Sequence, residues 1–198
     1  FITTSGIGEL EGRYRSISTG TTIEPGDAVL INGAIADHGM AILTSREDIK
    51  LAAPIESDCA PLAGLIAGAL GASDGIRFMR DATRGGLATV LCELAQQRSL
   101  GIEIDEQSVP VHDPVRGVCD MFGFAPMYVA NEGKVVMVVD GGDAPGVLDA
   151  LRSHPNGREA ARIGTVVADH PGRVEAETEI GGRRILDILA GDQLPRIC

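Results

Sequence analysis

Residues 79–95, Met-Arg-Asp-Ala-Thr-Arg-Gly-Gly-Leu-Ala-Thr-Val-Leu-Cys-Glu-Leu-Ala, contain the pattern that decides the fold. A strand expected over 75–79 runs into a turn at Gly85 and Gly86, because glycine adopts turn conformations at little steric cost. Beyond the turn, apolar residues recur at intervals of three and four, and this spacing predicts a helix over 86–97 that buries one face. These residues are Leu87, Val90, Leu91, Leu94 and Ala95.

The same two kinds of pattern continue on both sides of this unit. Apolar runs predict further strands over 28–31, 101–104, 127–130, 135–139, 161–167 and 173–177. Amphipathic spacing predicts further helices over 37–46, 59–70, 113–122 and 144–152. We expect Asp37 to cap its helix and the last two strands to form a hairpin. Strands alternating with helices predict an α+β fold, a layered α/β arrangement with helices packed on a sheet.

Composition excludes several classes of function. The chain has 198 residues, of which 44% are hydrophobic and 23% charged, enough for a folded core. A net charge of -11 and only 3% aromatic residues argue against nucleic-acid binding. No apolar run is long enough to span a bilayer. The four cysteines contain no C-x-x-C pair, which predicts a reducing, cytoplasmic location and no zinc site.

The turn before the 86–97 helix predicts an anion site. Free N–H groups and the positive end of the helix dipole favour a negative ligand there. Gly85 and Gly86 allow close approach to the backbone, while Arg84 offers a bidentate donor and Thr83 a hydroxyl. Asp81 is suited to orient a hydroxyl or a Mg²⁺ ion. The plainer interpretation is that Thr83 caps the helix and that Arg84 is solvated.

A second candidate site lies in Tyr-Val-Ala-Asn-Glu-Gly, residues 128–133. Glu132 is expected at the end of a strand, where a carboxylate can be held rigidly and partly removed from water. Such burial raises a carboxylate pKa and makes the group a better general base. The alternative is an ordinary solvated glutamate in a turn.

The third candidate is the last residue, Cys198, in the ending Leu-Pro-Arg-Ile-Cys. A thiol at the end of a tail can reach into another active site. The adjacent terminal carboxylate would raise its pKa and Arg196 would lower it. The alternative is that this cysteine is incidental.

Taken together, these motifs resemble the HypE family of hydrogenase maturation proteins, within the PurM-like superfamily of aminoimidazole ribonucleotide synthetases. The matching segments are residues 57–62, 79–95, 128–133, 181–187 and 195–198, in the family's order along the chain.

The resemblance implies a parent protein with an N-terminal ATP-binding domain, which forms a homodimer, and a C-terminal α/β domain. Residues 1–24 would be the end of the N-terminal domain, and residues 25–190 the PurM-like C-terminal domain. Residues 191–198 would be a tail that carries Cys198. The start within an expected strand at Phe1 is interpreted as a truncation.

The resemblance also implies a reaction. A carbamoyltransferase partner would place a carbamoyl group on Cys198, and ATP would drive its dehydration to a thiocyanate. The nitrile would then pass, as cyanide, to iron on a maturation scaffold complex for [NiFe]-hydrogenase. A carboxamide oxygen is a poor leaving group, and phosphorylation by ATP would convert it into a good one.

By the same resemblance, Cys198 would be the carrier and Glu132 the base. The residues facing ATP would be Asp81, Thr83, Arg84, Gly85, Gly86 and Asn131. The Mg²⁺ ligands and a partner lysine would lie in the N-terminal half of the family. We therefore expect this chain alone to be inactive as a dehydratase.

Two other interpretations remain open. The chain can belong to another ATP-dependent synthetase or small-molecule kinase of the superfamily, for which Cys198 is dispensable. It can also be a non-catalytic docking module whose tail only binds a partner.

Overall fold

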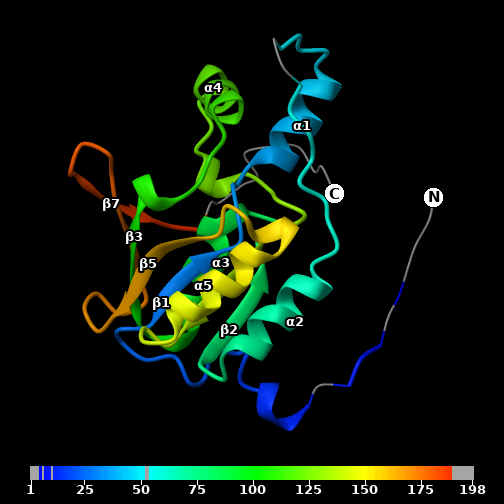
Figure 1. Ribbon diagram of the computed structural model, residues 1–198. Helices are drawn as coiled ribbons and strands as arrows, with labels where there is room; N and C mark the ends of the chain where they lie inside the picture. The colour runs from blue at the N-terminus through cyan, green and yellow to red at the C-terminus, as the bar shows by residue number, and fades with distance from the viewer. Residues whose placement is uncertain (1–4, 6, 10, 52–53, 189–198) are drawn as a thin grey trace.

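The computed structural model describes residues 5, 7–9, 11–51 and 54–188. This part of the chain folds into a mixed sheet of seven strands with helices on both faces (Figure 1). The strands are β1 (Ala28–Ile31), β2 (Ile76–Asp81), β3 (Gly101–Asp105), β4 (Val135–Val139), β5 (Ala161–Val167), β6 (Val174–Glu177) and β7 (Arg183–Leu186). The helices are α1 (Asp37–Arg46), α2 (Ala63–Ala72), α3 (Gly86–Arg98), α4 (Asp113–Phe122) and α5 (Ala144–Ser153). The predicted α+β fold class is confirmed.

The sheet has the strand order β2-β4-β1-β5-β3-β6-β7. All neighbours pair antiparallel except β3 and β6, which run parallel. Because β4 runs opposite to β1 and β2, the start of β4 lies at the same end of the sheet as the ends of β1 and β2. The loops 32–36, 82–85 and 131–134 therefore meet there.

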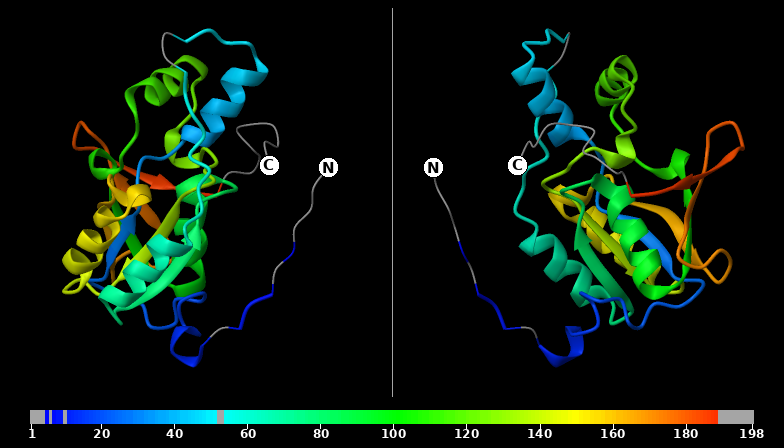
Figure 2. Two further views of the ribbon diagram at one scale, coloured as in Figure 1. Left: turned by 45° about the vertical axis from the view of Figure 1, so that its right-hand side comes forward. Right: turned by 180° about the vertical axis from the view of Figure 1, so that it is seen from behind.

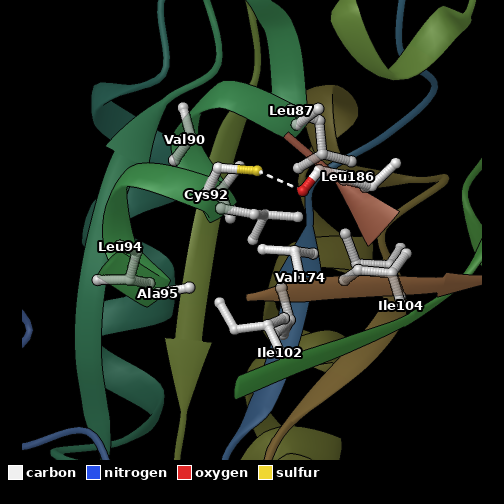
Figure 3. Packing of buried hydrophobic residues seen from close by; sticks show 14 of the residues in the cluster. Leu87, Val90, Cys92, Leu94, Ala95, Ile102, Ile104, Val174 and Leu186 are labelled. Carbon is white, nitrogen blue, oxygen red and sulfur yellow. Dashed lines mark hydrogen bonds between the residues drawn. The ribbon is translucent and has the colours of Figure 1, made fainter. Parts of the chain in front are cut away.

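Side chains alternate between the two faces of the sheet along each strand, so an apolar layer lies on each face. In β1, Val29 and Ile31 face α3, whereas Ala28 and Leu30 face α2 and α5. The buried face of α3 packs on the sheet as its spacing predicts (Figure 3). The Cys92 thiol, on α3, donates to the Leu186 carbonyl at 3.4 Å and joins α3 to the edge strand β7.

A smaller apolar cluster joins α1 and α4, which stand together beyond the strand ends (Figures 1 and 2). Met40 and Leu43 of α1 pack there with Val115, Val118 and Cys119 of α4. These two helices thus stand over the end of the sheet where the three loops meet. Among the described residues, no helix has both the length and the apolar character that crossing a membrane requires.

Two expected strand features are wrong. Residues 127–130 form no strand, because Pro126–Tyr128 is a 3₁₀ turn and the Val129 carbonyl accepts a bond from the Asn131 side chain. The last two strands form no hairpin with each other, since β3 lies between β5 and β6 and bonds to both. Ile102 and Ile104 of β3 fill the core from this position.

The helix expected from residue 59 begins at Ala63 instead. Residues 54–60 remain irregular and run past the turn at 131–134. Strand β7 was not predicted. The boundary proposed at residue 24 stays a prediction, and residues 191–198 lie outside the described part of the chain.

Candidate active site

The loop after β2 carries most of the predicted anion site. Asp81 and Arg84 are exposed, Thr83 is half-buried, and the Thr83 hydroxyl donates to the Asp81 carboxylate at 2.6 Å. The residue that precedes α3 is Gly85, in the left-handed region at φ 71°, and no side chain caps the helix. The interpretation of Thr83 as the helix cap is therefore wrong, because its hydroxyl is bonded to Asp81 instead.

Gly86 is required by the fold itself. It is buried with φ 65°, and a Cβ there would lie 2.6–2.7 Å from backbone atoms of Met127, Tyr128 and Val129. The glycine thus allows α3 to begin against the 3₁₀ turn. The first turn of α3 contains no acidic residue, so no side chain of that turn neutralises the positive end of the helix beside Arg84.

Asn131 is a buried clamp between three segments. It is 0% exposed, its amide nitrogen donates to the carbonyls of Ala82 (2.8 Å) and Val129 (3.0 Å), and its oxygen accepts the Ala36 N–H at 2.7 Å. The amide is therefore committed to the protein backbone. These bonds assign the Asn131 side chain to holding the three segments together, and its predicted contact with a nucleotide stays a prediction.

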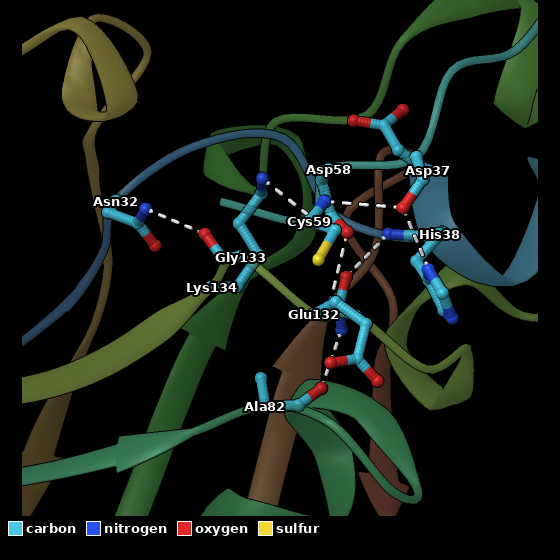
Figure 4. Close-up of polar contacts among 12 residues, drawn as sticks. Asn32, Asp37, His38, Asp58, Cys59, Ala82, Glu132, Gly133 and Lys134 are labelled. Atoms are coloured by element: carbon cyan, nitrogen blue, oxygen red, sulfur yellow. Dashed lines mark hydrogen bonds and ion pairs between the residues drawn. The ribbon is translucent and has the colours of Figure 1, made fainter. Parts of the chain in front are cut away.

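Glu132 follows Asn131 and is half-buried. Its backbone N–H donates to Asp58 Oδ1 at 3.1 Å, and Asp58 Oδ2 lies 3.2 Å from Lys134 Nζ (Figure 4). A Cβ on Gly133, between them, would overlap the Asp58 carbonyl oxygen. The turn and the 54–60 segment are thus in direct contact, and within the described residues the Glu132 carboxylate has no ion-pair or hydrogen-bond partner.

The 54–60 segment is also tied to α1, through the Ser57 hydroxyl and His38 Nδ1 at 2.9 Å. From the sequence, Asp58 was recognised only as part of the 57–62 motif, and Lys134 was not predicted. The usable signals were the position of Asp58 in a distinctive motif and the position of Lys134 two residues after Glu132.

A cavity of about 880 Å³ opens beside this turn. Its charged lining includes residues of both signs: Asp37, Glu56, Asp58, His112, Asp113, Lys134, Arg158 and Glu159. Among the described residues, no group of three acidic, histidine or cysteine side chains is placed to hold a metal ion. The mixture of charges in its lining suits a polar organic group, and sequence patterns did not predict it because its walls come from five separate segments.

His112 links two carboxylates at the rim of this cavity. Its Nδ1 lies 2.9 Å from Asp37 Oδ1, and its Nε2 lies 3.2 Å from Glu159 Oε2. The bond to Asp37 is the main cause of a raised His112 pKa, while burial is the main cause of a raised Asp37 pKa. Asp37 does not cap α1, since that position is taken by Ala36 at φ 74°.

The last described residues run close to the 3₁₀ turn Pro126–Tyr128. The Asp187 N–H donates to the Tyr128 hydroxyl at 3.2 Å, so the chain passes beside the 3₁₀ turn that precedes Glu132. Cys198 lies outside the described residues. Of the other cysteines, Cys92 and Cys119 are buried, which raises the pKa of each thiol to about 11, and Cys59 is exposed.

Comparison with known proteins gives a family match over most of the chain. Residues 24–177 match the family described as AIR synthase related protein, C-terminal domain. The carbamoyl dehydratase HypE of Azotobacter vinelandii is 48% identical over 199 residues, covering 100% of this chain and 58% of that protein. The chain thus spans less than two thirds of this relative.

Solved structures give the same result. A HypE–HypF complex matches with a TM-score of 0.81 and 40% identity, over 86% of this chain and 55% of that one. A hydrogenase maturation protein HypE in complex with ATP matches with a TM-score of 0.84 and 39% identity, over 89% and 54%.

Proposed function

This chain belongs to the AIR synthase related family, and because it aligns along its whole length with HypE proteins, we propose that it is the C-terminal part of a carbamoyl dehydratase for hydrogenase maturation. In this reaction ATP phosphorylates the oxygen of a carbamoyl group on the Cys198 sulfur. Loss of phosphate breaks the carbon–oxygen bond, and the nitrogen gives up both protons. The product is a thiocyanate on Cys198. Release of its nitrile to iron as cyanide, with the thiolate restored, takes two electrons, which the iron-carrying acceptor complex would supply.

The observation that carries this proposal is the path of the chain beside Tyr128. The hydrogen bond from Asp187 to Tyr128 anchors the chain close to the turn that bears Glu132. Ten residues follow Ile188, and an extended segment of that length spans up to about 33–36 Å. Cys198 is therefore within reach of Glu132.

Glu132 suits the role of the base that removes the amide protons. Its backbone is fixed at Asn131 and by Asp58, while its carboxylate has no partner among the described residues. A base needs such a free carboxylate at a fixed position. The positive end of α3, with Arg84 and the glycines Gly85 and Gly86, suits the phosphates of ATP.

Magnesium does not fit the described residues by themselves. Asp81 already accepts the Thr83 hydroxyl, and no three-ligand group is present in the described part of the chain. Ligands for Mg²⁺ are expected in the N-terminal domain of the parent protein. For this reason we also propose that the chain alone does not turn over ATP.

The partners follow from the same proposal. A HypE relative forms a complex with HypF, which supports a carbamoyltransferase partner for this protein. We further propose an iron-carrying scaffold complex as acceptor, a homodimer formed by the N-terminal domain, and a cytoplasmic location. The three described cysteines are free thiols, as a reducing compartment requires.

The test is the mass of the C-terminal peptide. The full-length protein is incubated with its carbamoylating partner and ATP, and we expect Cys198 to gain a carbamoyl group that then loses one water. Cys198→Ser should give no adduct, and Glu132→Gln should stop at the carbamoyl stage. Cys59→Ser is the matched control for the specificity of the adduct, because Cys59 is the exposed thiol of the described residues and should carry no carbamoyl group.

The cavity favours a second candidate, a sibling synthetase or kinase that acts on a free small molecule. Its volume of about 880 Å³ is within the usual range for small-molecule sites. An unmodified C-terminal peptide, with ATP still consumed on a free substrate, would support this candidate.

A further inference from the structure

We propose that Asp58 and Lys134 are a positioning pair for Glu132, a role that neither the fold nor the reaction assigns to them. The proposal rests on the proposed function of Glu132 as the base. A base whose carboxylate has no partner depends on its backbone for its position. The contacts of Asp58 and Lys134 fix that backbone on both sides of Glu132.

The two oxygens of Asp58 have different partners. Oδ1 accepts the Glu132 N–H at 3.1 Å, and Oδ2 lies 3.2 Å from the Lys134 ammonium. Glu132 and Lys134 are separated only by Gly133, whose missing Cβ leaves room for the Asp58 carbonyl. One carboxylate therefore holds both ends of a three-residue stretch.

The burial of this pair argues for a positioning role. The Asp58 side chain is 3% exposed and that of Lys134 is 11% exposed. Removing two such charges from water has a cost that their attraction offsets only in good geometry, so buried pairs add little net stability. They can instead favour one backbone conformation over others. Here that conformation sets the direction in which the Glu132 side chain projects from the turn.

A purely structural ion pair of similar burial exists elsewhere in the molecule and provides the control. Asp27 has a side chain that is 3% exposed, and its Oδ1 lies 3.3 Å from Arg77 Nε. This pair sits at the opposite end of β2. Loss of either carboxylate should lower stability, but only loss of Asp58 should change the chemistry.

The experiment uses the full-length protein after its partner has carbamoylated Cys198. Dehydration is followed in a single turnover through the mass of the C-terminal peptide. Asp58→Ala should lower the rate constant about 10- to 100-fold, the effect of a small misplacement of a reacting group. The KM for ATP and the extent of carbamoylation should not change, because the buried Asp58 carboxylate is engaged by the Glu132 N–H and by Lys134.

Asp58→Asn should recover most of the lost rate, because its amide oxygen can still accept the Glu132 N–H. Asp27→Ala should keep the wild-type rate per folded molecule. If Asp58→Ala and Asp27→Ala lower activity only in proportion to the unfolded fraction, the role of Asp58 is structural and the proposal is overturned.

The Glu132→Gln variant distinguishes failure of the positioning role of Asp58 from failure of the proposed role of Glu132 as the base. If Glu132→Gln is inactive while Asp58→Ala is as fast as wild type, the positioning role alone fails. If Glu132→Gln is itself fully active, the proposed base is wrong and the positioning role fails with it. Where Asp58→Ala does not fold, Lys134→Met replaces it. It should lower the rate about tenfold at unchanged KM, and a wild-type rate would contradict the proposal.

Discussion

The two ends of the β2–β4 strand pair use charge in opposite ways. At one end, the Arg77 guanidinium contacts the carboxylates of Glu24, Asp27 and Asp140 and also the Thr22 carbonyl. Every charged group of this cluster has a partner. The cluster fastens the segment before β1 to the sheet.

At the other end, the turn at 131–134 is held by a neutral amide, one buried ion pair and a glycine contact. Asn131 and Asp58 use their polar atoms on the backbone or on Lys134, and the carboxylate of Glu132 is left over. Charges that pair with one another hold segments together and have no remaining capacity, whereas a fixed charge without a partner is available for a reaction. This difference separates a structural cluster from a candidate active site.

The largest effect should come from Gly133→Ala at the site end. A Cβ would overlap the Asp58 carbonyl, so we expect a loss of more than about 3 kcal/mol in the free energy of unfolding. Gly68→Ala is the control, since no atom lies within 4 Å of its Cβ position in α2. It should stabilise the protein by about 0.5–1 kcal/mol. Chemical denaturation measures both, and equal effects would contradict the close contact at Gly133.

Asn131→Leu should cost about 2–3 kcal/mol, because it leaves the buried Ala36 N–H and two carbonyls without this partner. It should also abolish dehydration, since the turn is no longer held. Gln107→Ala, which removes one exposed bond, is the comparison and should be nearly neutral. A stable Asn131→Leu protein would show that water or rearrangement replaces the clamp.

Arg77→Met tests the opposite end. It leaves Asp27 buried without its cation, and the Arg77 side chain is 19% exposed. We expect a loss of about 2 kcal/mol, between the values for exposed and fully buried pairs. The dehydration rate per folded molecule should be unchanged. A rate that fell as far as that of Asp58→Ala would remove the distinction between the two ends.

The smallest effect concerns the titration of His112. Its raised pKa means that the folded state favours the protonated form. The stabilisation is therefore complete below the unfolded value, about 6.5, and is lost as pH rises through the raised value. Because His112 is well exposed, we expect less than about 1 kcal/mol. Unfolding at pH values on both sides of this range should show the change, and His112→Gln should remove it.

Much of the fold could be predicted from local patterns, and the exceptions have physical causes. The helices 86–97 and 113–122 followed from apolar spacing, because each buries one face. The prediction of a β5–β6 hairpin was wrong because β6 pairs instead with β3, a parallel partner that is distant in sequence. No local pattern encodes such pairing. The prediction of a strand at 127–130 was wrong because the Asn131 side chain donates to the Val129 carbonyl, which the hydrogen-bond ladder of a strand would have used.

The site was predictable only in part. The loop after β2 and Glu132 were recognisable, since each lies within a short distinctive motif. The Asp58–Lys134 pair joins residues 76 positions apart. The role of Asn131 as a clamp also depends on segments that only the tertiary fold brings together. The assignment of Cys198 as carrier stays a prediction.

The position of β1 within the sheet has a consequence for synthesis on the ribosome. Both of its neighbours, β4 and β5, come much later in the chain, and Asn32 just after it bonds to residues 101 and 124 positions away. At about 5–20 residues per second, roughly 5–20 s pass before the first of these partners is made. During that time an apolar Ala-Val-Leu-Ile segment is exposed on the nascent chain. Such an exposed apolar segment is prone to aggregation until its partner strands have been made.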